Sequence, residues 1–325
     1  MTLSVSPPFW HPAFFQGFIL DWDGVLAETK LNFAPIREKY FGGEFVPLLE
    51  AAQSLPPERR EDLNRAIYDL EMAGAETAEA VPGAFELLKW LEDEKKPWCV
   101  VSRNCRDSIH LAAARCGLPL PSVVKSRDEP PVKPEPEALW SAALALGVPF
   151  EKCLMVGDFL YDLVGARRAG MRAVLVQRPR AEWKHWADVS FDRLTDFVAS
   201  LKAPEPLVPW EYASLAEDEG REKLAERAGH RVLLSGKDPL ILPKALSLAE
   251  RGILLFALED SGPLSAEQWK NMPAIPPSLL DQPLAPVLQS LLSFRYPLAE
   301  IADGADGRPS LREGEGLDRL LEKIP

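Results

Sequence analysis

The chain has few of the residues that build zinc sites and disulfide frameworks. Its 325 residues include four cysteines and four histidines. The cysteines, which are Cys99, Cys105, Cys116 and Cys153, include no Cys-x-x-Cys pair, and the histidines are scattered along the chain. Structural zinc sites need such ligands in closely spaced pairs. We therefore expect no zinc site, and reduced thiols of the kind found in cytoplasmic proteins.

Basic charge and long apolar runs are also scarce. Lys and Arg number 37 against 49 Asp and Glu, which gives a formal net charge of −12 and a pI of about 5.0. Nucleic-acid phosphates attract basic surfaces, so this balance argues against a nucleic-acid partner. No apolar run reaches the roughly 18 residues that a membrane-spanning helix needs. Residues 1–16 lack a basic segment before an apolar one, so we expect a cytoplasmic protein whose N-terminal residues form an arm packed on the first domain.

Length and composition predict two domains. Hydrophobic residues make up 46% of the chain and charged residues 26%, which is enough apolar surface for a substantial core. Prolines gather in residues 203–210, as is typical of a stiff linker. We therefore expect a first domain over residues 1–202 and a smaller accessory domain over residues 211–325.

The most informative segment is an apolar run that ends in two carboxylates. Residues 18–20 are followed by Asp21-Trp22-Asp23-Gly24. Such a run is typical of a buried parallel strand, and open α/β sheets bind their ligands at the carboxyl ends of such strands. Alternate side chains of an extended segment share a face, so both carboxylates point the same way. A turn with two solvated acids is the simpler explanation of an isolated Asp-x-Asp, so the other motifs decide whether this one is functional.

Three further segments place polar side chains after apolar runs or at the start of a helix. They are Ser102, Arg103 and Asn104 after the run 97–101, Lys133 before an amphipathic helix beginning near residue 136, and Asp158 and Asp162 after the run 153–157. Taken alone, each has a simpler explanation: a turn serine, a solvated lysine, or acids that cap a helix. Their joint occurrence in one order favours a functional site.

This set of motifs resembles the haloacid dehalogenase-like (HAD) hydrolase superfamily. Its four motifs are an Asp-x-Asp, a Ser or Thr, a Lys and a paired acidic motif, and the likeness covers about residues 15–200. The segment from Gly157-Asp158 through Ala169-Gly170-Met171 is close to the phosphoglycolate-phosphatase-like branch. The resemblance implies an α/β fold with a doubly wound, Rossmann-like parallel sheet. It also implies a Mg²⁺-dependent phosphatase acting on a small phosphorylated metabolite.

Roles for the motif residues follow from this resemblance and from the chemistry of phosphate esters. Asp21 would be the nucleophile that forms an aspartyl-phosphate, and Asp23 the general acid and base. Lys133 and the Ser102 hydroxyl would bind the phosphoryl oxygens, with Arg103 and Asn104 as weaker candidates for substrate contact. The expected Mg²⁺ ligands are Asp21, the backbone carbonyl of Asp23, Asp158 and Asp162, the last in the first or second coordination shell.

Two alternatives to a phosphatase remain open at this stage. A phosphomutase of the β-phosphoglucomutase type would use the same aspartyl-phosphate and return the phosphoryl group to a sugar. A non-catalytic scaffold would keep the fold, but the four intact motifs disfavour it. Family members that dehalogenate lack the second carboxylate, so Asp23 indicates an oxygen leaving group. Glu28-Thr29 replaces the Asp-Ser that the family often has, which leaves the alignment of the substrate less certain.

Between the first motif and residue 81 lies a helical insert. Residues 33–40, 45–55 and 57–72 have helical apolar spacing. In the resembling family a helical cap is inserted at this point of the chain, here at about residues 30–80. It closes over the site and selects the substrate. Asn32, Arg37 and Lys39 are candidates for substrate contact, although an exposed helix face explains each of them more simply.

The last part of the chain resembles nothing that we recognise. We expect strands at 231–234 and 252–257 and helices at 211–229, 239–251 and 286–294, which is a small α/β arrangement. Ser235-Gly236-Lys237 is not a nucleotide-binding loop, since Gly229 lies seven positions before Gly236 where five are required. We expect self-association or a protein partner through this domain.

Overall fold

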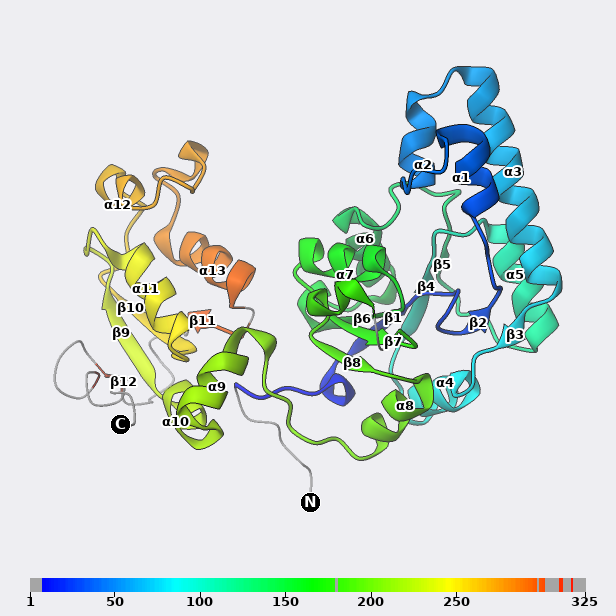
Figure 1. The fold of residues 1–325 in the computed structure, drawn as a ribbon. Coiled ribbons are helices and arrows are strands. Elements are labelled where there is room, and N and C mark those ends of the chain that lie inside the picture. The colour runs from blue at the N-terminus through cyan, green and yellow to red at the C-terminus, as the bar shows by residue number, and fades with distance from the viewer. Residues whose placement is uncertain (1–7, 179–180, 297, 302–309, 312–316, 318–325) are drawn as a thin grey trace. The chain divides into compact units, whose positions relative to one another are not determined.

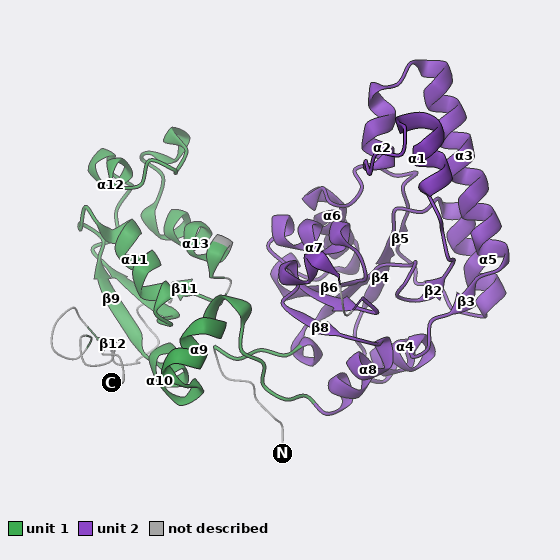
Figure 2. Cartoon of the chain, viewed as in Figure 1, with its two compact units in different colours: residues 1–11, 204–325 green, residues 12–203 purple. Residues whose placement is uncertain are grey.

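The chain folds into two compact units, which are described separately. The computed structural model describes residues 8–178, 181–296, 298–301, 310–311 and 317. Residues 12–203 form one unit, and residues 1–11 with 204–325 form the other (Figure 2). The described N-terminal residues thus group with the C-terminal unit, whereas the sequence predicts that they pack on the first domain. Trp10 explains this difference, because its backbone N–H donates to the Leu207 carbonyl at 3.0 Å and its carbonyl accepts from Leu207 at 2.8 Å.

A six-stranded sheet is the centre of the 12–203 unit (Figure 1). Its order is β5 (Val124–Lys125), β4 (Trp98–Val101), β1 (Gly17–Leu20), β6 (Cys153–Gly157), β7 (Arg172–Val176) and β8 (Val189–Phe191), and every pair is parallel. Strands β1, β6 and β7 are buried along their whole length, as their apolar sequences predict. The strand order reverses at β1, which lies between β4 and β6, and such a reversal opens a crevice at the carboxyl ends.

Helices cover both faces of this sheet because alternate strand residues point to opposite sides. Ile19 and Met155 pack with α6 (Pro136–Leu146) and α7 (Leu160–Ala169). On the other face Phe18 meets Trp90 of α4 (Ala84–Asp93), with 5.7 Å between ring centroids. The remaining elements are α5 (Arg106–Cys116), α8 (Leu194–Lys202), η1 (Pro12–Phe14), η3 (Phe150–Lys152) and η4 (Glu182–Trp186). The predicted doubly wound sheet is confirmed.

The helical insert lies between two short strands that pair antiparallel, β2 (Ala27–Glu28) and β3 (Glu79–Ala80). It consists of α1 (Ala34–Phe41), α2 (Leu48–Ala51), η2 (Ala52–Ser54) and α3 (Pro57–Glu76), close to the predicted helices. Ile36, Leu63 and Ile67 belong to a small apolar core of its own. Helix α3 runs beside α5 of the sheet domain (Figure 1). We call residues 29–78 the cap.

The other unit contains a parallel sheet in the order β11 (Glu300–Ile301), β10 (Leu255–Glu259), β9 (Arg231–Ser235) and β12 (Ser310–Leu311). Its helices are α9 (Ala213–Glu219), α10 (Arg221–Gly229), α11 (Ile241–Glu250), α12 (Ala266–Lys270) and α13 (Leu284–Arg295), with η5 (Trp210–Tyr212) and η6 (Pro277–Leu279). The predicted small α/β arrangement is confirmed. One expected helix is divided in two at Gly220, whose φ of +87° a helix cannot contain. Strands β11 and β12 were not predicted.

Within the described residues, no helix combines the length and the apolar character that crossing a bilayer requires. The four cysteines are all free, and Cys99, Cys105 and Cys153 are buried. Burial raises the pKa of the Cys99 thiol to about 12, so this thiol stays protonated and packs as an apolar side chain.

Candidate active site

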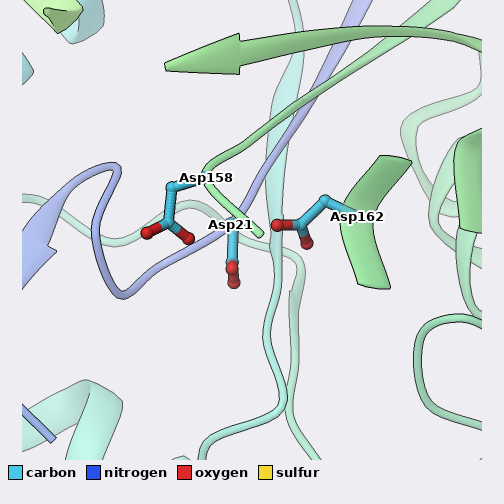
Figure 3. Close-up of side chains that lie close together, drawn as sticks. All are labelled: Asp21, Asp158 and Asp162. Carbon is cyan, nitrogen blue, oxygen red and sulfur yellow. The ribbon is translucent and has the colours of Figure 1, made fainter. Parts of the chain in front are cut away.

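The carboxyl ends of three neighbouring strands bring the motif residues together. Asp21 directly follows β1, Ser102 follows β4 and Asp158 follows β6. Because β4, β1 and β6 are adjacent and parallel, these residues reach one edge of the sheet at the point where the strand order reverses. Figure 3 shows the carboxylates of Asp158 and Asp162 on either side of Asp21.

Lys133 is buried beside two of these carboxylates. Its Nζ lies 3.0 Å from Asp21 Oδ1 and 2.6 Å from Asp162 Oδ1, and only 1% of its side chain is exposed. Burial acts to lower the pKa of Lys133, but the carboxylates of Asp162 and Asp21 outweigh it and the pKa is raised. The site therefore contains a fixed positive charge in contact with Asp21.

The three acids are crowded enough to form a cation site. Asp21, Asp158 and Asp162 each offer a carboxylate oxygen, and these oxygens all lie within 4.8 Å of one another. Burial and the charge of Asp21 raise the pKa of Asp158 well above its usual value, and the same causes raise the pKa of Asp162 to about 6. An all-oxygen set of this kind suits Mg²⁺, so the residues fit the ion that the family motifs imply.

Two glycines make this close approach possible. At Gly24, where φ is +73°, an added Cβ would collide with the Asp158 carboxylate. At Gly157 an added Cβ would collide with the Asp162 side chain. A larger side chain at either position would displace an acid of the cluster.

The carboxylate of Asp23 is held by Thr29, the first residue of the cap. Its Oδ1 accepts the Thr29 backbone N–H at 2.8 Å and also the Thr29 hydroxyl. Burial raises the pKa of Asp23 to about 6, although the bonds from Thr29 act in the opposite direction. A carboxyl group with such a pKa can both donate and accept a proton near neutral pH. Thr29, noted in the sequence as a departure from the family, therefore orients this carboxylate.

A single cavity of about 370 Å³ collects these residues. All of the predicted site residues line it: Asp21, Asp23, Ser102, Arg103, Asn104, Lys133, Asp158 and Asp162. Of the three cap candidates, Asn32 and Arg37 also line the cavity. Lys39 does not, because its Nζ bonds to Asp62 at 2.9 Å and to the Tyr40 hydroxyl at 2.8 Å.

Ser102 and Asn104 are buried residues of the cavity lining. The Ser102 Oγ accepts the Asn104 backbone N–H at 3.2 Å. The side-chain Nδ2 of Asn104 is buried without a hydrogen-bond partner among the described residues. A buried donor without a partner costs about 1–3 kcal/mol, and a ligand oxygen in the cavity would remove that cost.

Arg103 lines the cavity, but its guanidinium already has hydrogen-bond partners within the protein. Both terminal nitrogens bond to the Glu50 carboxylate of the cap helix α2 at 2.8 Å, and the guanidinium lies 4.1 Å from the Tyr161 ring centroid. One nitrogen also donates to the Lys133 backbone carbonyl. Arg103 thus connects the cap to the segment that carries Lys133.

Two further charged residues of the lining were not identified from the sequence. Arg178 pairs with Asp158 at 2.8 Å, and Glu71 of α3 accepts from Arg127 at 3.1 Å and from the Cys105 backbone at 2.8 Å. Arg178 follows the buried strand β7, which is the same signal that identified Asp21. Glu71 gives no such signal, because it lies in the middle of a long helix.

Residues 15–170 match the family described as hydrolase, haloacid dehalogenase-like hydrolase. Hexitol phosphatase A of Escherichia coli is 32% identical over 188 residues, which are 50% of this chain and 84% of that protein. Pyrophosphatase PpaX of Halalkalibacterium halodurans is 28% identical over 181 residues, covering 49% and 81%. A solved structure of a hydrolase from Pseudomonas syringae has a TM-score of 0.48 at 23% identity, covering 58% of this chain and 99% of its own. The family match and the alignment with hexitol phosphatase A over 84% of that protein agree. This chain therefore belongs to the haloacid dehalogenase-like hydrolases.

Proposed function

We propose that this protein is a Mg²⁺-dependent phosphatase that hydrolyses a small phosphate monoester through a phosphorylated Asp21. The observation that carries the proposal is the contact between Asp21 and the buried ammonium of Lys133, beside two further acids in one cavity. Two relatives, hexitol phosphatase A and a probable pseudouridine-5'-phosphatase of Drosophila melanogaster, are named as phosphatases. The segment from Gly157 to Met171 favours the phosphoglycolate-phosphatase-like branch, and the free cysteines are consistent with the cytoplasm.

Each motif residue has a distinct role in the proposed reaction. The Asp21 carboxylate attacks phosphorus, and the bond from phosphorus to the ester oxygen breaks. Asp23 gives its proton to that leaving oxygen. It then accepts a proton from the water that attacks phosphorus, while the bond from phosphorus to the Asp21 oxygen breaks and inorganic phosphate is released. Lys133, Ser102 and the Asn104 amide bind the phosphoryl oxygens as their charge grows.

Asp21, Asp158 and Asp162 would hold the metal, together with the Asp23 backbone carbonyl. When bound, Mg²⁺ supplies positive charge that offsets the repulsion between these carboxylates and the phosphate dianion. Lys133 contributes a second positive charge, and its contacts with Asp21 and Asp162 keep both carboxylates in place.

Phosphorus NMR separates a hydrolase from the alternative phosphomutase. We expect incubation with a panel of phosphorylated metabolites, hexose monophosphates included, to give free phosphate and one equivalent of dephosphorylated product. A mutase would convert a hexose monophosphate into its isomer without net release of phosphate. Isomer formation without phosphate would overturn the proposal, and a scaffold would change none of the spectra.

The reaction should depend on the 12–203 unit alone. Every residue that lines the cavity belongs to this unit, which has its own sheet and core. We therefore expect a fragment of residues 12–203 to release phosphate from p-nitrophenyl phosphate at a rate within about tenfold of the whole chain. A folded, soluble fragment with no activity would show that the other unit contributes to the site.

A further inference from the structure

The cap side of the cavity differs in chemistry from the side that holds the acids and Lys133. Its wall consists mainly of hydrocarbon side chains, which are Leu31, Phe33, Phe45, Leu48, Leu49 and Ile67. A polyhydroxylated leaving group would place hydroxyl groups against this wall without hydrogen-bond partners, which is unfavourable. Polar recognition by the cap therefore depends on the few charged groups set into it.

Arg37 is a cation in this wall that has no carboxylate partner among the described residues. The other lining cations have carboxylate partners, since Lys133 pairs with Asp21, Arg103 with Glu50 and Arg178 with Asp158. Over the described ranges of the chain, no carboxylate lies within ion-pair distance of the Arg37 guanidinium. Among these described residues the guanidinium donates one hydrogen bond, from Nε to the Val46 carbonyl. Its length of 3.5 Å is at the upper limit for a hydrogen bond.

Aromatic contact holds this guanidinium in place. It lies 4.4 Å from the Phe45 ring centroid and 5.9 Å from that of Phe33. A cation–π contact of this kind leaves the terminal N–H groups of the guanidinium available to an acceptor. Glu71, the acid that α3 contributes to the lining, does not compete, because Arg127 neutralises it.

We propose that Arg37 binds a second anionic group, a carboxylate or a phosphate, on the leaving group of the substrate. The protein would then select doubly anionic phosphate esters over neutral alcohol phosphates. Planar, bidentate recognition of a carboxylate or phosphate is what an unpaired guanidinium edge offers, and an apolar wall strengthens it. This inference rests on the proposed phosphatase activity and adds the class of substrate.

Matched esters test this selectivity. We would compare 4-(carboxymethyl)phenyl phosphate with its amide, which has the same shape and a similar leaving oxygen but no second charge. Propane-1,3-diol bisphosphate and the corresponding monophosphate would test a second phosphate in the same way. We expect kcat/KM to be at least about tenfold higher for one of the two anionic esters than for its neutral partner, mainly through KM.

Variants assign the preference to Arg37. We expect Arg37→Gln to lower kcat/KM for the preferred anionic ester about tenfold and for its neutral partner much less, and Arg37→Lys to keep part of the preference. Lys39→Gln is the matched control, since Lys39 lies on the same helix and bonds to Asp62 outside the cavity. Equal kcat/KM within both wild-type pairs, or a preference that survives Arg37→Gln, would overturn the inference and leave the proposed function standing. Phosphate release from none of the esters would contradict the proposed function itself.

Discussion

Asp21→Asn is expected to lower phosphate release by about 10⁴-fold or more. The amide of asparagine is a very weak nucleophile, so the aspartyl-phosphate cannot form. The fold should survive, because asparagine has nearly the same shape and Lys133 keeps its contact with Asp162 at 2.6 Å. Loss of one negative charge also reduces repulsion within the cluster of three acids.

Steady-state phosphate release and thermal unfolding of the same preparations would measure this effect. Asp196→Asn is the matched control, since Asp196 pairs with Arg193 on the surface and does not line the cavity. We expect wild-type activity from the control variant. Near-wild-type turnover by Asp21→Asn would refute the assignment of the nucleophile.

Removal of the metal is expected to reduce activity to background. Three carboxylates with oxygens within 4.8 Å of one another must also accept a phosphate dianion, and the two positive charges of Lys133 and Arg178 cannot balance them. Exhaustive treatment with EDTA should therefore abolish phosphate release, and added Mg²⁺ should restore it. Mg²⁺ should also raise the melting temperature of the free protein, because an ion that binds the folded state stabilises it.

Asp158→Asn distinguishes this site from metal bound elsewhere. Neutralising Asp158 removes one of the three carboxylates, so we expect both the Mg²⁺-induced rise in melting temperature and most of the activity to disappear. Full activity after complete chelation would contradict a metal site at these acids. A melting-temperature shift of unchanged size in Asp158→Asn would place the ion at another position.

The fold and much of the site could be predicted because they depend on local sequence signals. Strands β1, β4 and β6 are apolar runs that end abruptly in polar residues, and parallel pairing of such strands brings their ends to one edge. The helices of the cap follow from apolar spacing in the same way. Placement of Asp21, Ser102 and Asp158 in one cavity therefore follows from the strand pattern once the sheet is assumed.

The features that could not be predicted depend on contacts between distant residues. The bidentate pair of Arg103 with Glu50 joins residues 53 positions apart, and no local pattern encodes it. Trp10 pairs with Leu207 across most of the chain, and no local pattern indicates that residues 8–11 group with the C-terminal unit. Strands β11 and β12 have two residues each, too few for an alternating pattern.

The most direct test of the account is to find the phosphoryl group on Asp21 during turnover. A rapid acid quench in the pre-steady state, followed by borohydride reduction, would convert an aspartyl-phosphate into homoserine, which mass spectrometry locates in the chain. The account predicts homoserine at position 21 in the wild-type protein with Mg²⁺ and substrate, and none without substrate. Homoserine at another acidic position, or a burst of leaving alcohol with no modified residue, would contradict it.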